Sequence, residues 1–323
     1  MHKFTRRTVI AGLGACAVTP AYAETAWPNR PITLMHGFPP GGPVDVLSRV
    51  LADGLSSRLG QQVIVDAKPG AAGTTAAGQV ARAVPNGYTL TAFGATFTAT
   101  AAMYRVLSYN PTEDFTFVST TAEFPLVLVT HSDSGIRSVA DVVKLAQSRG
   151  EPLLYGTAGN GSLMHLAMEL FFKRANIRLQ HVPYKGGLAA VTDLLGKRLD
   201  LVLDPPTVPV PFVRDNKLHA LAVTGADRFF ALPNAPTMVD SGFPGFVVTG
   251  YQGIAAPAGL PSEVTAKVNR ALAAVLTDPP IVEKLRTIGN IARSSTPEEY
   301  KARVVADIAR WKSVVDSAHL ARI

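Results

Sequence analysis

Apolar and polar positions along the chain alternate between the spacing of helices and the spacing of strands. In residues 44–59 apolar side chains recur every three or four positions, which predicts an amphipathic helix with Gly60 as its C-cap. Short apolar runs bounded by turn residues predict strands at residues 31–35, 62–66, 88–92, 126–130, 153–155, 179–182, 200–203, 218–223 and 253–256. Because the two patterns alternate almost throughout, we expect an α/β fold with parallel sheets covered by helices.

Two helix starts carry local signatures. Ser138 and Asp141 have the spacing of a capping box, which predicts a helix that runs to about Arg149. The same box at Thr296 and Glu299, with a proline at the first helical position, predicts the last long helix. No fixed-period repeat is visible, which excludes a solenoid.

Three strand-to-helix junctions are rich in glycine. They read MHGFPPGGPVD at residues 35–45, PGAAGT at 69–74 and TAGNGS at 157–162. Glycine lets backbone N–H groups approach a ligand closely, and the start of a helix adds unpaired donors and partial positive charge. The three turns together predict a site that holds a small oxygen-rich molecule from several sides.

Residues 1–23 have the composition of an export signal. A basic start with Arg6-Arg7 precedes an apolar run at 8–18 and the small-residue cleavage pattern Ala21-Tyr22-Ala23. The mature, exported chain is therefore expected to begin near Glu24. The arginine pair fits both a twin-arginine address and an ordinary signal, so the export route stays open.

Cys16 is the one cysteine of the chain, and it lies inside this signal. The mature protein would then hold neither a disulfide nor a thiolate site. Residues 13–16 also resemble a lipobox, so lipid anchoring at Cys16 is the alternative to cleavage after Ala23.

The mature chain carries little net charge. Of 31 basic residues, Lys3, Arg6 and Arg7 lie in the signal, which leaves 28 against 24 acidic residues. No block of Lys and Arg with interleaved aromatics is present, which argues against a nucleic-acid partner. No apolar run after the signal approaches the roughly 20 residues that a membrane span needs. About 300 residues favour two domains over one.

Taken in order, the motifs of the mature chain resemble those of the periplasmic solute-binding proteins of tripartite tricarboxylate transporters, the Bug family. The likeness covers nearly the whole mature chain. It rests on WPNRPI at 27–32, FPPGGPVD at 38–45, KPGAAG at 68–73, NGYTL at 86–90, HVPYKG at 181–186, LAVT at 221–224 with Arg228, and LPNAPT at 232–237. Two positions depart from the family pattern, Ala67 and Asn86, and neither touches the first glycine turn.

This resemblance implies a type II periplasmic-binding fold of two Rossmann-like lobes, joined by two crossover strands, that closes on a small carboxylate. Extended apolar segments at residues 124–129 and 251–257 are the expected crossings. Lobe 1 is then expected to comprise residues 24–126 with 252–323, and lobe 2 residues 127–251.

The first glycine turn has a specific expected geometry. If Pro43 is the first helical residue, Gly42 is the N-cap, and the Asp45 carboxylate can accept a hydrogen bond from the Gly42 N–H. The resemblance adds that Asp45 lines the cleft, so a cap alone and a cap that also meets the ligand through water both stay open. Phe38 is either an apolar wall of the site or part of the core.

Further candidates have competing interpretations. From the residues alone, Ser162 caps a helix and Asn160 forms a turn, whereas the resemblance favours contact with a ligand carboxylate. Lys185 is either a cation for a second carboxylate or a solvated charge, and Asp204 either meets the ligand or caps a turn.

His165 and Glu169 have a metal-ligand spacing, but no third ligand is evident, so a hydrogen-bonded helix histidine is favoured. The predicted ligand-binding set is Phe38, Pro40, Gly41, Gly42, Asp45, Gly73, Thr74, Thr157, Asn160, Gly161, Ser162, His165, Tyr184 and Asp204.

The leading hypothesis is a monomeric receptor, with no cofactor, metal or catalytic group, that captures an organic acid and passes it to two integral membrane subunits of a transporter. Aliphatic di- and tricarboxylates, acidic amino acids and aromatic acids all suit such a pocket. One alternative is a periplasmic enzyme on the same fold, for which Asp45, His165 and Asp204 are the candidate bases. Another is a receptor that presents its closed form to a membrane sensor.

Overall fold

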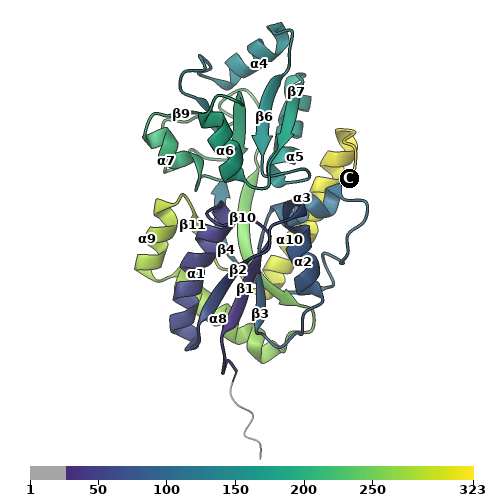
Figure 1. The fold of residues 1–323 in the computed structure, drawn as a ribbon, viewed down its shortest axis with the longest axis vertical. Helices are drawn as coiled ribbons and strands as arrows, with labels where there is room; N and C mark the ends of the chain where they lie inside the picture. Colours follow the sequence, from purple (N-terminus) through teal and green to yellow (C-terminus); the bar gives the residue numbers. More distant parts are fainter. Residues whose placement is uncertain (1–26) are drawn as a thin grey trace, which may run out of the picture.

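The computed structural model describes residues 27–323, so the predicted export signal and Cys16 lie outside the described residues. Two α/β lobes, each built on its own sheet, lie one above the other (Figure 1). Lobe 1 is defined here by a six-stranded sheet and lobe 2 by a five-stranded sheet.

Lobe 1 has the strand order β11-β4-β10-β3-β1-β2. Its strands are β1 Ile32–His36, β2 Val63–Ala67, β3 Thr89–Gly94, β4 Phe115–Pro125, β10 Thr249–Pro257 and β11 Ile291–Ala292. Lobe 2 has the order β7-β6-β8-β5-β9. Its strands are β5 Val127–His131, β6 Leu153–Thr157, β7 Leu179–Pro183, β8 Leu201–Asp204 and β9 Leu218–Val223.

The expectation of parallel sheets is wrong for the strands that carry the chain between the lobes. Strand β10 is antiparallel to both β3 and β4, and β5 is antiparallel to both β8 and β9. The cause is the chain path: β4 leads into β5 through Leu126 alone, and β10 brings the chain back beside β4 (Figure 1). Two neighbouring strands that leave and re-enter one lobe must run in opposite directions.

Each of the nine predicted strands corresponds to a strand of the structure, with ends that differ by at most four residues. Strand β4 was not predicted. Most of its positions are buried on both faces, and Thr and Ser stand among the apolar residues, so it lacks the alternation that marks a half-buried strand.

The helices cover both sheets. They are α1 Pro43–Leu59, α2 Thr74–Ala81, α3 Thr96–Met103, α4 Val139–Ser148, α5 Leu163–Ala175, α6 Gly187–Leu195, α7 Pro209–Arg214, α8 Ser262–Leu276, α9 Pro279–Thr287 and α10 Pro297–Ser317, with a short 3-10 helix at Ala71–Gly73. None of the helices within residues 27–323 is both long enough and apolar enough to cross a membrane.

Helix ends follow their local signals closely. Gly60 adopts a left-handed conformation, with φ of 70°, at the end of α1, as a C-cap glycine should. At α10, the reciprocal hydrogen bonds of the capping box between Thr296 and Glu299 are both present. At α4, Ser138 caps the Asp141 N–H as expected, but the Asp141 carboxylate accepts from the Arg137 N–H instead of closing the box.

Candidate ligand-binding cavity

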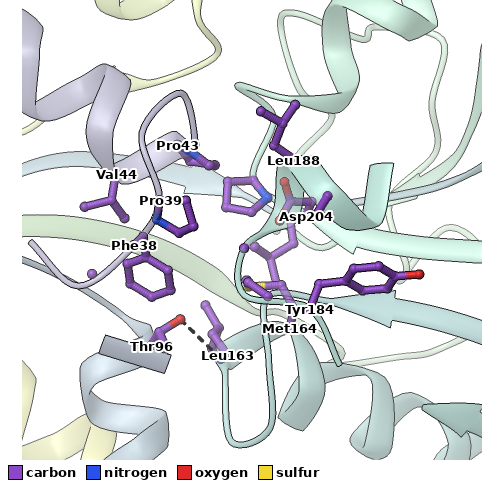
Figure 2. Close-up of a pocket in the computed structure, with 18 of the residues that line it drawn as sticks. Phe38, Pro39, Pro43, Val44, Thr96, Leu163, Met164, Tyr184, Leu188 and Asp204 are labelled. Carbon is purple, nitrogen blue, oxygen red and sulfur yellow. Dashed lines mark hydrogen bonds between the residues drawn. The ribbon is translucent and has the colours of Figure 1, made fainter. Parts of the chain in front are cut away.

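A cavity of about 480 Å³ lies between the lobes and is lined from both (Figure 2). Lobe 1 contributes the β1–α1 turn around Phe38 and Gly42, and the β3–α3 junction at residues 94–96. Lobe 2 contributes the start of α5, the β7–α6 junction and the end of β8. The crossings add Phe124, Leu126, Tyr251 and Gln252. Most of the lining side chains are apolar, with a few polar groups at the ends of strands and helices.

The β1–α1 turn has nearly the predicted geometry. Pro43 is the first residue of α1, and Gly42 is its N-cap in an extended conformation. The Asp45 carboxylate accepts from the Gly41 N–H at 2.9 Å, not from the Gly42 N–H as expected. The difference arises because Gly41, with φ of 77°, turns its own N–H toward the helix. Phe38, Pro40 and Gly42 line the cavity, whereas Gly41 does not.

Asp45 lies behind this turn. Only 2% of it is exposed, it does not line the cavity, and its carboxylate is also hydrogen-bonded to Arg49 and to His36 Nε2. Burial acts to raise the pKa of Asp45, but the hydrogen bonds from Arg49, Gly41 and His36 outweigh it, so the pKa lies below its usual value. The observed contacts of Asp45 are therefore those of a residue that holds the turn in shape.

The second glycine turn supports the first. Gly37 and Gly73 approach so closely that a side-chain carbon on Gly37 would lie 2.3 Å from the Gly73 Cα. Thr74 turns its hydroxyl back to the Ala71 carbonyl, at 3.0 Å. Neither Gly73 nor Thr74 lines the large cavity.

The third glycine turn is held by hydrogen bonds to α5 and β7 of the same lobe. The Ser162 hydroxyl caps α5 by accepting from the His165 N–H, and the Gly161 N–H donates to His165 Nδ1. The Thr157 hydroxyl lies 2.7 Å from His181 Nε2. Of the four candidates in this turn, Thr157, Asn160, Gly161 and Ser162, none lines the cavity; their neighbours Ala158, Leu163 and Met164 do.

His165 also lies away from the cavity. Its ring stacks on that of His181 with centroids 4.2 Å apart, and burial lowers the pKa of His165 to about 4 and that of His181 to about 3. Glu169 accepts a hydrogen bond from the Tyr155 hydroxyl at 2.7 Å. Among residues 27–323 no group of three side chains is arranged to hold a metal ion.

Two predicted residues lie in the cavity wall, Tyr184 in the β7–α6 junction and Asp204 at the end of β8. Tyr184 donates its hydroxyl to Asp193, and burial together with this bond raises the pKa of Tyr184 to about 12. Asp204 ends β8 with both carboxylate oxygens buried and without a hydrogen-bond partner. Burial raises the pKa of Asp204 well above its usual value.

The sequence analysis missed the β3–α3 junction. Gly94, Ala95 and Thr96 line the cavity, and the Leu163 N–H of lobe 2 donates to the Thr96 hydroxyl at 3.4 Å (Figure 2). Gly94 follows a predicted strand, as the glycines of the other three turns do, and this was the available signal. Asn290, next to β11, gave no such signal, because only the fold brings it to the cavity.

Two α/β lobes that are joined by crossing strands and enclose a cavity between their strand-to-helix turns have the architecture of a two-lobed ligand-binding protein. Within that class, residues 47–320 match the family model described as tripartite tricarboxylate transporter family receptor. The chain therefore belongs to this family of periplasmic receptors, which confirms the resemblance seen in its motifs.

Related proteins and solved structures support this family membership. The chain is 34% identical over 314 residues to a UPF0065 protein from the tcbD-tcbE intergenic region of Pseudomonas sp. (strain P51), covering 96% of this chain and 94% of that protein. It is 32% identical to protein BugT of Bordetella pertussis over 308 residues, covering 95% and 94%. An R. palustris protein solved with adipate superposes with a TM-score of 0.88 at 34% identity, covering 91% of this chain and 98% of that one. MatC from Rhodopseudomonas palustris, solved with bound malate, gives 0.85 at 29% identity, covering 90% and 100%.

Proposed function

We propose that this receptor captures a small organic carboxylate between its lobes and passes it to the two integral membrane subunits of a transporter. The observation that carries the proposal is the state of three helix starts at the cavity. The N-caps of α1, α3 and α6 are Gly42, Ala95 and Gly186, and none of them has a side-chain capping bond. All three line the cavity.

The first N–H groups of a helix have no partner within the helix, and they carry its partial positive charge. Of the helices with a side-chain bond at the N-cap, α4 and α10 begin away from the cavity, whereas α5, capped by Ser162, begins at its wall. Oxygens of a bound carboxylate would supply the missing acceptors at the cavity. Charge-assisted hydrogen bonds contribute about 1.5–3 kcal/mol each, so a few of them suffice for micromolar affinity. The adipate and malate bound by the two R. palustris proteins support this chemistry.

Closure of the lobes would signal that the site is occupied. A side-chain carbon on Gly186 would lie 3.1 Å from Pro39 Cδ, and Asn290 Nδ2 donates to the Thr207 hydroxyl at 3.2 Å, so lobes 1 and 2 already touch around the cavity. A ligand held from both sides favours the closed form by its added contacts. In this proposal the lobes divide near residues 126 and 251, and the receptor acts as a monomer after export.

An enzymatic role has little support at the site. Of the three candidate bases, Asp45 and His165 are bonded within their own lobes away from the cavity, and Asp204 is the one that lines it. We therefore propose binding without turnover. A pull-down with membrane subunits separates a transporter partner from a sensor.

The direct test is a thermal-shift screen of the mature chain against an acid library, with the neutral diamide of each diacid as a matched ligand control. Acids that bind should raise Tm further as their concentration increases, and the diamides should not. If no organic acid raised Tm while a neutral sugar or a cation did, the proposed function would be wrong.

A further inference from the structure

Asp204 occupies an unusual place in the cavity wall. It is the last residue of β8, only 1% of it is exposed, and neither carboxylate oxygen has a hydrogen-bond partner. It lies directly against the first residue of α6, since a side-chain carbon on Gly187 would come within 2.0 Å of Asp204 Oδ1. Figure 2 places it among Leu188, Tyr184 and Met164, on the lobe 2 side of the cavity.

The charges around Asp204 do not neutralise it. Tyr184, Lys185, Asp193 and Tyr251 are the other titratable residues of the described cavity wall, and none of them is hydrogen-bonded to Asp204. Asp193 is already paired with Arg198 at 2.8 Å and with the Tyr184 hydroxyl at 2.7 Å. Burial is the cause that raises the pKa of Asp204. A buried carboxyl without a partner takes up a proton, because its charged form loses the solvation of water.

We propose that Asp204 is an un-ionised carboxylic acid that donates its O–H to a carboxylate oxygen of the ligand, and that it thereby selects dicarboxylates over amino acids of equal chain length. This inference rests on the proposed function and deepens it. An ionised Asp204 would repel an anionic ligand, whereas a neutral one adds a donor beside the free N–H groups of α6. A carboxylic acid that donates to a carboxylate forms a short, charge-assisted hydrogen bond.

The reverse arrangement is the competing one. An ionised Asp204 would accept a hydrogen bond from a ligand ammonium group. The ligand pair adipate and 6-aminohexanoate separates the two, because these molecules have the same chain length and differ at one end. The neutral acid predicts tighter binding of adipate, since the ammonium end of 6-aminohexanoate would meet N–H donors instead of acceptors. An ionised acid predicts the opposite order.

The variants Asp204→Asn and Asp204→Leu give an independent readout by calorimetry at pH 7. Asn keeps the shape of the side chain and an N–H donor, so adipate affinity should stay within about threefold of the wild type. Leu keeps the branched shape of the side chain, with a larger volume and without a donor, and affinity should fall by about tenfold or more. Asp215→Asn, an exposed aspartate at the end of α7 in the same lobe, is the matched control and should leave affinity unchanged.

Three results with these variants and this ligand pair would overturn the inference. These are an equal loss of adipate affinity in the Asn and Leu variants, unchanged affinity in both, and tighter binding of 6-aminohexanoate than of adipate by the wild type. If the Leu variant failed to fold, the Asn variant and the ligand pair would still distinguish a neutral Asp204 from an ionised one. Absence of binding by every straight-chain dicarboxylate from succinate to suberate would also overturn it. The proposed function would be wrong as well only if no acid of the library raised Tm.

Discussion

Arg49 donates from Nε and Nη2 to the two carboxylate oxygens of Asp45, one helical turn earlier in α1, at 2.9 and 3.0 Å. The fork uses both oxygens of a nearly buried carboxylate, which also accepts from the Gly41 N–H and lies 3.1 Å from His36 Nε2. Asp45, the acidic residue predicted to contact a ligand in the first glycine turn, therefore makes its hydrogen bonds within lobe 1.

Asp45→Ala should lower the free energy of unfolding by about 2 kcal/mol, because several charge-assisted hydrogen bonds to one buried group are lost together. Ligand affinity should fall too, since the Gly41 turn loses its anchor. Urea denaturation measures the first effect and calorimetry the second. Asp53→Ala, at an exposed position of the same helix, is the control and should change neither. A stable Asp45→Ala protein with normal affinity would show that the bonds to Asp45 do not hold the turn.

The stacked pair His165 and His181 should make the protein sensitive to mild acid. Their pKa values of about 4 and about 3 lie below the 6.5 of a free histidine, so the unfolded chain binds more protons as the pH falls below 6.5. The contribution of these neutral histidines to the free energy of unfolding should be fully present above pH 6.5. By pH 5 the free energy of unfolding should be lower by about 2 kcal/mol for each histidine.

His181→Gln removes one titrating ring and keeps a polar partner for Thr157. Its Tm at pH 7.5 can be lower than that of the wild type, but the further drop between pH 7.5 and 5 should be smaller. The exposed His319→Gln is the control and should follow the wild type. Equal pH-dependent losses in all three proteins would contradict the assignment of the acid sensitivity to this pair.

Gly42→Val should weaken ligand binding without unfolding the protein. Gly42 has φ of −79° and ψ of 171°, a conformation that valine adopts readily, and it lines the cavity at the start of α1. The added side chain would cover the N–H groups of α1, and the acid-induced thermal shift should be lost. Gly150→Val, where a side chain meets nothing within 4 Å, is the control. An undiminished thermal shift in Gly42→Val would remove this turn from the site.

Gly186→Val should hinder closure of the lobes. The new side chain would press on Pro39 of lobe 1 at the point where the lobes meet, although the extended backbone at Gly186 accepts valine. Small-angle scattering should then show a ligand-saturated protein that is less compact than the saturated wild type, with weaker affinity. Gly150→Val again serves as the control. Normal compaction on ligand addition would argue against this contact as part of the closed state.

Local features were predictable because their causes are local. The apolar spacing of α1, the left-handed Gly60 and the capping box at Thr296 depend on residues within one turn of each other. Strand β4 was not predicted, because a strand buried on both faces lacks the alternation of apolar and polar residues. Its burial depends on partners that are distant in the sequence. The antiparallel direction of β10 likewise follows from the path of the chain between lobes.

By itself, the sequence determined the α/β fold class and the glycine-rich turns that follow the strands. Its motifs also identified the family. Only the tertiary structure decided which of those turns reach the cavity. Thr157 and Ser162 turned out to be bonded within lobe 2, to His181 and to the His165 N–H, while Ala95 and Asn290 were brought to the cavity wall. It also decided that Asp45 is bonded on all sides and Asp204 on none. The physical reason is that hydrogen-bond partners and burial come from segments distant in sequence, and these set whether a polar side chain stabilises the fold or remains free for a ligand.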